Sequence, residues 1–199
     1  MTRAHDAPRP PDRSVSLDHF VGMYEAKTDP WDNASKWSDQ RKYAVTMASL
    51  PRGRYRRCYE PGCAVGLLTR LLAPRCDEIL AVDAVPEAVR TATEAVREFP
   101  HVTVERAILP ADLPDGAFDL IVIGDLLYYL SAADLDELLT GLIERLDPDG
   151  EIVAVHYRDP RGETYDGSHV HEALKKNLDT VIHHDDEWFV LDVLKLRRY

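Results

Sequence analysis

The stretch "CYEPGCAVGLLTRLL", residues 58–72, decides the fold of this chain. It places Gly62 and Gly66 between a hydrophobic, strand-like run and a helix-like run. Glycine has no Cβ, so the backbone of such a turn can approach a ligand closely and adopt dihedral angles that other residues resist. The stretch therefore predicts a strand, a ligand-binding turn and a helix in succession.

Strand-like and helix-like segments alternate along the rest of the chain. The sequence predicts helices at 16–26, 34–50, 66–73, 86–99, 131–146 and 170–177, and strands at 55–60, 78–83, 102–106, 118–125, 151–158, 180–184 and 187–197, with a turn at "PDG", residues 148–150. Alternating strands and helices form parallel sheets, whereas the last two strands meet at "DDE" as a hairpin. We expect an α/β fold: a Rossmann-like, seven-stranded, mostly parallel sheet with a C-terminal antiparallel hairpin and helices on both faces.

Length and charge limit the possible functions. The 199 residues fit one domain, predicted at 16–199 with a helical lid at about 16–50, behind a disordered tail at 1–15. The formal charge of -11 repels phosphate backbones and anionic membranes, so we expect neither as a partner. No apolar run is long enough to span a membrane, and three cysteines cannot all pair, which indicates reduced thiols in the cytoplasm. The sequence leaves open a monomer or a homodimer.

Two acidic residues accompany the glycine turn. Glu60 ends the first strand of the alternating region, and Asp83 ends the second. Ligands of such sheets bind beyond the carboxyl ends of the strands, where an acid after the second strand can accept both ribose hydroxyls. The turn lacks the lysine and the glycine spacing of phosphate-binding loops, and Glu60 suits a cationic amine better than a pyrophosphate. The pattern predicts a nucleoside with an amine-bearing tail, such as S-adenosylmethionine.

At these residues the chain resembles the class I S-adenosylmethionine-dependent methyltransferases. Their acidic-x-Gly-x-x-x-Gly motif corresponds to Glu60, Gly62 and Gly66, and their ribose-binding acid corresponds to Asp83. The stretches "DPWDNASKWSDQRKY", "EPGCAVGLLT", "DLLYYL" and "VAVHYR…VHEAL" more specifically resemble the nodulation protein S family, over residues 20–197. This resemblance implies methyl transfer to the nitrogen of a small-molecule amine, the founding case being a glucosamine-type amine of a chitin oligosaccharide.

The predicted cofactor site draws on the strand ends and on the N-terminal segment. Its residues are Trp31, Arg41, Glu60, Gly62, Cys63, Ala64, Gly66, Asp83, Ala84, Ala107, Ile108, Gly124, Asp125 and Leu126. Ala107 and Ile108 stand where the superfamily often has an acid, so adenine is expected to rest on apolar contacts and backbone bonds, with Asp112 a distant candidate. Because tryptophan is costly to expose, Trp31 and Trp37 should each cover something, either the core or the cofactor, with Arg41 or Tyr43 near the methionine carboxylate.

Asp125 and His156 are the predicted catalytic residues. Asp125 is expected to hold an acceptor amine by hydrogen bond, and His156 to take its proton, because histidine titrates near neutrality. A strand-end turn residue and a satisfied sheet histidine remain the alternatives for these two positions. The predicted substrate contacts are Tyr128, Tyr129, His156 and Arg158, although the two tyrosines also suit packing at a helix start.

Other functions remain open from the sequence. The pairs His169/His171 and His183/His184 lack the acid-rich pattern of a metal site, so no metal is expected. An O-methyltransferase, or a module that binds the cofactor without catalysis, also fits the motifs.

Overall fold

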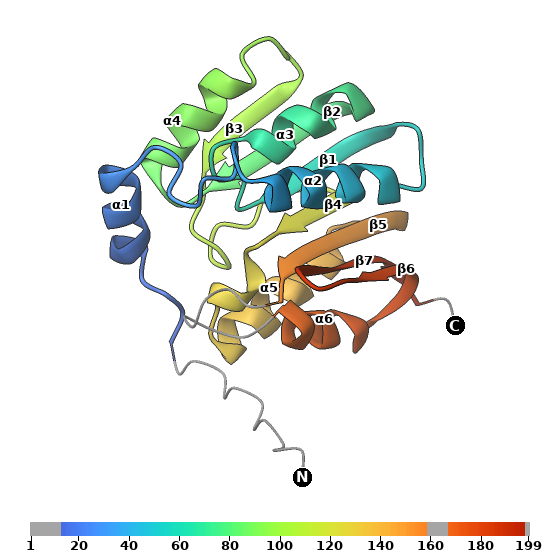
Figure 1. Cartoon of the computed structure of the whole chain (residues 1–199). Helices are drawn as coiled ribbons and strands as arrows, with labels where there is room; N and C mark the ends of the chain where they lie inside the picture. The colour runs from blue at the N-terminus through green and yellow to red at the C-terminus, as the bar shows by residue number, and fades with distance from the viewer. Residues whose placement is uncertain (1–12, 159–166, 198–199) are drawn as a thin grey trace.

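A seven-stranded sheet forms the centre of the computed structural model, which describes residues 13–158 and 167–197 (Figure 1). The strands are β1 (Tyr55–Pro61), β2 (Cys76–Asp83), β3 (Val102–Arg106), β4 (Phe118–Gly124), β5 (Leu146–Tyr157), β6 (Leu178–Asp185) and β7 (Phe189–Leu196). Their order is β3-β2-β1-β4-β5-β7-β6, with β1 to β5 parallel and β7 antiparallel to both of its neighbours. The predicted fold class is confirmed.

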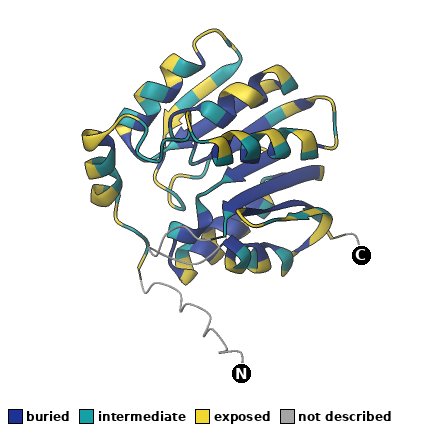
Figure 2. Cartoon of the chain, viewed as in Figure 1, coloured by how far each residue is buried: buried dark blue, intermediate teal, exposed yellow. Residues whose placement is uncertain are grey.

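Helices cover both faces of the sheet (Figure 1). They are α1 (Leu17–Ala26), α2 (Trp37–Ser49), α3 (Leu67–Leu72), α4 (Pro86–Ala95), α5 (Ala132–Glu144) and α6 (Gly167–Lys175), with 3-10 turns η1 (Ala73–Arg75) and η2 (Leu127–Tyr129). Side chains of α2, α3 and α4 share one apolar cluster with the sheet, and those of α5 and α6 share a second. The buried sheet lies between these two layers (Figure 2).

Strand β5 begins earlier than the sequence predicts. Phe118 pairs with Leu146, but the next pair in this ladder is Leu120 with Glu151. Residues 147–150, which contain the predicted "PDG" turn, therefore form an irregularity inside the strand. A bulge places extra residues on one strand without ending the pairing, which is why the turn signal did not mark the start of the strand.

The residues just before α1 are bonded to the start of α5. Residues 1–12 of the predicted tail lie outside the described residues. Ser14 accepts the backbone N–H of Ser131 at 2.7 Å, and the N–H of Val15 donates to the carbonyl of Tyr129 at 2.8 Å. These bonds attach the segment before α1 to the carboxyl edge of the sheet.

Gly66 serves the packing of two helices. It precedes α3 with φ 79°, and a Cβ at this position would lie 2.9 Å from the Cα of Ala92 in α4. A cavity lies at the carboxyl ends of the parallel strands, and Gly62 lines it whereas Gly66 does not. The sequence predicts a glycine that allows close approach here, and the structure shows that the backbone of α4 makes this approach.

Gly66→Ala is therefore expected to destabilise the fold by about 2–5 kcal/mol, from left-handed strain and overpacking. Gly22→Ala is a matched control, because Gly22 lies within α1 and a Cβ there meets nothing within 4 Å. The control should change the free energy of unfolding by less than about 1 kcal/mol, towards stability. Urea unfolding measures both; equal midpoints for Gly66→Ala and the wild type would refute the packing role.

Candidate functional site

A cavity of about 700 Å³ opens at the carboxyl ends of the parallel strands. Residues of α1, of the segment before α2 and of the β6–β7 turn also line it. Fifteen predicted site residues line it: Trp31, Glu60, Gly62, Cys63, Ala64, Asp83, Ala84, Ala107, Ile108, Gly124, Asp125, Leu126, Tyr128, Tyr129 and Arg158. Arg41, Gly66 and His156 are not among the lining residues.

Glu60 lines this cavity and has one buried carboxyl oxygen without a hydrogen-bond partner. The residue is 3% exposed, and its Oε2 has no hydrogen-bond partner. Burial raises the pKa of the Glu60 carboxyl to about 8; the Thr69 hydroxyl lowers it and the charge of Asp83 raises it. A buried polar atom without a partner costs free energy, so this oxygen is suited to a cationic group entering from the cavity.

The turn after β1 is shaped by left-handed backbone. Gly62 has φ 75° and Ala64 has φ 48°, and the N–H of Ala64 donates to Asp83 Oδ2 at 3.0 Å. Asp83 Oδ1 accepts the N–H of Val85 at 3.0 Å. Burial raises the pKa of Asp83, although these backbone bonds oppose the shift. Each carboxylate oxygen keeps a second lone pair, so the fixed carboxylate can still accept two hydroxyl groups.

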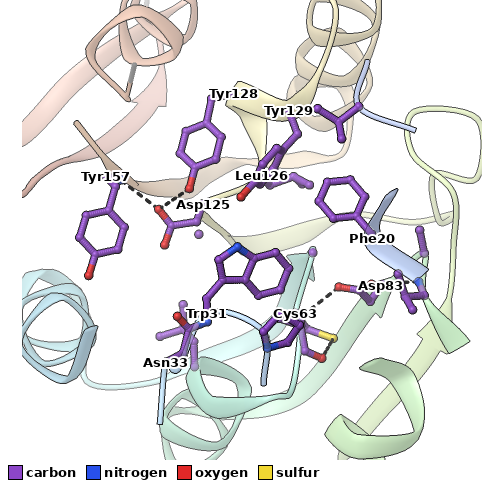
Figure 3. Close-up of a pocket in the computed structure, with 18 of the residues that line it drawn as sticks. Phe20, Trp31, Asn33, Cys63, Asp83, Asp125, Leu126, Tyr128, Tyr129 and Tyr157 are labelled. Carbon is purple, nitrogen blue, oxygen red and sulfur yellow. Dashed lines mark hydrogen bonds between the residues drawn. The ribbon is translucent and has the colours of Figure 1, made fainter. Parts of the chain in front are cut away.

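Aromatic side chains of the N-terminal segment cover the cavity. Trp31 packs edge-on against Tyr24 at 5.7 Å between ring centroids, and Phe20 packs against Tyr129 at 5.1 Å. Figure 3 shows Trp31 among the lining side chains, with Asp125 towards one side and Asp83 towards the other. Trp31 therefore packs against its aromatic neighbours and also lines the cavity. The expectation for Trp37 is wrong, because its side chain is 74% exposed.

Asp125 is held by donors from three directions. Its Oδ1 accepts the Tyr128 hydroxyl at 3.0 Å and the N–H of Tyr157 at 2.9 Å (Figure 3). Its Oδ2 pairs with the Lys42 ammonium. Its backbone is left-handed, with φ 50°, and its N–H donates to the carbonyl of Val155 at 2.9 Å. The carboxylate is thus fixed at the end of β4, on the cavity wall.

Sequence reasoning gave no role to Lys42, which is fully buried in α2. Its ammonium also pairs with Asp39 at 3.0 Å and lies 3.9 Å from the centre of the Tyr157 ring. The residue is 0% exposed. The helix periodicity places both Asp39 and Lys42 on one face of α2, but only the fold shows that this face meets Asp125.

His156 lies behind the cavity wall. Its side chain is 0% exposed, its Nε2 accepts the N–H of Leu127 at 3.2 Å, and its Nδ1 lies 3.0 Å from Nε2 of His171. His171 in turn contacts Asp192 at 2.6 Å. Because the backbone donor occupies Nε2, the His156 proton resides on Nδ1 and is donated to His171.

The prediction that His156 takes a proton from the acceptor is therefore corrected. Burial lowers its pKa well below the ordinary value, with the charges of His171 and Lys42 adding to the effect. Side chains alternate between the two faces of a strand, so the neighbouring Tyr157 faces the cavity and His156 faces α6. The alternative of a satisfied sheet histidine describes this residue.

Two other predicted contacts are also corrected. Arg41 pairs with Asp186 of the β6–β7 turn at 2.5 Å and lies over the ring of Phe189, away from the cavity lining. Tyr43, the other candidate beside it, does line the cavity. Asp112 accepts the N–H of Ile108 at 2.9 Å and stabilises its own loop.

Comparison with known proteins places the chain in a family. The profile of nodulation protein S (NodS) matches residues 22–190. The chain belongs to the NodS family. It is 29% identical to nodulation protein S of Rhizobium tropici over 163 residues, covering 77% of this chain and 68% of that protein. It is 31% identical to the Sinorhizobium fredii protein over 137 residues, covering 68% of this chain and 63% of the relative.

Solved structures support the same fold. A structure of a candidate methyltransferase from Pseudomonas syringae is 40% identical with a TM-score of 0.72, covering 80% of this chain and 99% of that one. The N-methyltransferase NodS of Bradyrhizobium japonicum WM9, in complex with S-adenosyl-L-homocysteine, is 22% identical with a TM-score of 0.82 and covers 90% and 98% of the two chains. The predicted family resemblance is thus confirmed, and the chain spans about two thirds of the length of its nodulation protein S relatives.

Two further findings concern the described residues. No helix in 13–158 or 167–197 combines the length and apolarity needed to cross a membrane. The same residues contain no cluster of histidine, cysteine and carboxylate ligands suited to a metal ion.

His156→Leu should destabilise the protein by about 1–3 kcal/mol, because the N–H of Leu127 loses its buried acceptor. His156→Gln should recover part of this loss, since its amide oxygen can accept the same N–H. Urea unfolding at neutral pH measures both variants. If the leucine variant is as stable as the wild type while methyl transfer is abolished, the structural role of His156 is refuted and a catalytic role is supported.

Proposed function

We propose that this NodS-family protein transfers a methyl group from S-adenosylmethionine to the nitrogen of a small-molecule amine, an amino sugar or a related metabolite. The observation that carries the proposal is Glu60, which lines the cavity beside the glycine turn and has a buried carboxyl oxygen without a partner. The α-ammonium group of the cofactor is the cation that this oxygen suits. The family membership and the SAH complex of the Bradyrhizobium japonicum N-methyltransferase support the same cofactor.

The residues present fit this cofactor along the first three parallel strands. Glu60 would hold the ammonium group, Asp83 the ribose hydroxyls, and Ala107 and Ile108 would flank the adenine ring. The half-buried Trp31 and residues of α1 line this end and would cover a bound cofactor. We infer that residues 16–50 act as a cover within a single methyltransferase domain.

When bound, the cofactor supplies a methyl group on a positively charged sulfonium, which is already a good leaving group. The acceptor nitrogen must arrive with a free lone pair, because that pair forms the N–C bond as the C–S bond breaks and its electrons remain on sulfur. The chain mainly aligns the two reactants and excludes water. The Asp125 carboxylate, fixed by Tyr128 and Tyr157, is the group that would orient the N–H bonds of the amine.

The acceptor end of the cavity favours an amine over a hydroxyl. Asp39 and Asp125 both line this end, and negative charge stabilises the positive charge that develops on an attacking nitrogen. Tyr128 and Arg158 are the further substrate contacts we propose, with Tyr129 nearer the aromatic cover. A hydroxyl acceptor would instead require a base, and His156 cannot serve because both of its ring nitrogens are engaged.

The net charge indicates the kind of partner. At a formal -11 the protein repels nucleic acid and anionic membranes over long range, so we infer a small-molecule acceptor met in the cytoplasm.

The experiment is a radiolabelled methyl-transfer assay over amino sugars, with the matching sugars that carry a hydroxyl in place of the amine. We expect label on the amines alone, and thermal stabilisation of the protein by S-adenosylhomocysteine but not by NAD or ATP. Asp83→Ala should weaken the binding of S-adenosylhomocysteine by about 1.5–3 kcal/mol, because the charge-assisted hydrogen bonds to the ribose hydroxyls are lost. Glu105→Ala, an exposed acid on β3, is the control. Label on hydroxyl groups, or stabilisation by NAD alone, would overturn the proposal.

A further inference from the structure

The Asp39–Lys42–Asp125 cluster places a cation between two carboxylates at the acceptor end of the cavity. The Lys42 ammonium pairs with Asp39 at 3.0 Å and also with Asp125. Lys42 itself is fully buried and does not line the cavity, whereas both carboxylates do. A buried ion pair is costly to assemble, so its presence beside a binding site calls for a reason other than stability.

We propose that Lys42 sets the charge of the acceptor end at one net negative charge, and thereby sets the protonation state in which an amine acceptor is held. This inference rests on the proposed function. Lys42 acts through the two carboxylates and touches neither reactant, so it is a specificity-setting residue of α2 and not a catalytic one.

The argument follows from what an amine needs before it can accept a methyl group. A protonated amine has no free lone pair, and two carboxylates without a counter-ion would favour that protonated form. One negative charge still stabilises the positive charge that passes from sulfur to nitrogen during transfer. Lys42 cancels the second charge, so the site retains this stabilisation with less tendency to trap the amine as an unreactive ammonium.

The other titratable groups that face the cluster leave this charge unchanged. Burial raises the pKa of Tyr43 and Tyr128 well above the ordinary value and also raises that of Tyr157. Burial also lowers the pKa of His156, behind Asp125, so that all four of these side chains are neutral near pH 7.

Two further acidic residues lie outside the cluster, and of these Glu60 lines the cavity and Asp29 does not. The negative charges of Glu60 and Asp29 add to the rise in the pKa of Tyr43. Lys42 itself remains charged, because Asp125 and Asp39 outweigh the lowering effect of burial on its pKa.

Arg158, Lys36 and Glu187 also line the cavity, but Arg158 pairs with Asp185 and Lys36 bonds to the carbonyl of Trp31. Within the part of the chain that the structure describes, Asp39 and Asp125 form ion pairs with Lys42 and with no other cation, so the three members of the cluster set the charge beside the two carboxylates.

The test is the pH dependence of kcat with saturating amine, because its acidic limb reports groups in the bound complex. Lys42→Met leaves two uncompensated carboxylates, so the limb should move to higher pH by about one unit or more. Asp39→Asn makes the cluster neutral, so the limb should move to lower pH. The double variant, Lys42→Met with Asp39→Asn, restores one negative charge and should return the limb close to its wild-type position.

Lys42→Arg is the matched control, since it keeps the charge and should leave the limb in place even if it lowers kcat. Stabilisation by S-adenosylhomocysteine checks that each variant still folds and binds the cofactor. If Lys42→Met fails to fold, Asp39→Asn alone still tests the direction of the shift. A limb that stays fixed in Asp39→Asn, or a double variant that does not return towards the wild type, would overturn this inference and leave Lys42 as an anchor of α2. A wild-type protein that methylates no amine would instead overturn the proposed function.

Discussion

The strand order of the sheet reverses between β1 and β4, and the functional site depends on this reversal. The chain after β1 runs outward to β2 and β3, then returns to pair β4 with the other side of β1. The connections therefore diverge above these two strands, and a crevice is left at their carboxyl ends. Glu60 and Asp125 come from the two strands on either side of this crevice, so the topology alone brings the two ends of the site together.

Several polar groups around the crevice are arranged for binding at the expense of stability. Burial raises the pKa of Glu60 from 4.5 to about 8, so the folded protein holds a proton that the unfolded chain releases across that range. The free energy of unfolding therefore falls as the pH rises between these values. The left-handed backbone of Asp125 and the buried ammonium of Lys42 add further cost. A cofactor amine would offset the first of these costs directly.

The sequence predicts the features that depend on local pattern. Glu60, Asp83 and Asp125 each follow an apolar run that predicts a strand. Because the carboxyl ends of parallel strands lie at one edge of the sheet, the sequence places these three acids at the same edge. It does not predict pairings between distant elements: Arg41 meets a turn more than 140 positions away. The prediction that His156 faces the cavity is wrong, because the position of a residue near a strand end does not determine which face of the sheet its side chain lies on. Lys42 was missed because its role exists only once α2 is docked on the sheet.

The central claim is that the buried Glu60 carboxyl is built to receive the cofactor's ammonium group. Calorimetric titration of S-adenosylhomocysteine at pH 7, in buffers of different ionisation enthalpy, tests it most directly. Because the Glu60 pKa of about 8 leaves the carboxyl mostly protonated at this pH, binding an ammonium should release close to one proton, and Glu60→Gln should bind more weakly and release none. Binding without proton release in the wild type, or the same release from Glu60→Gln, would contradict the account.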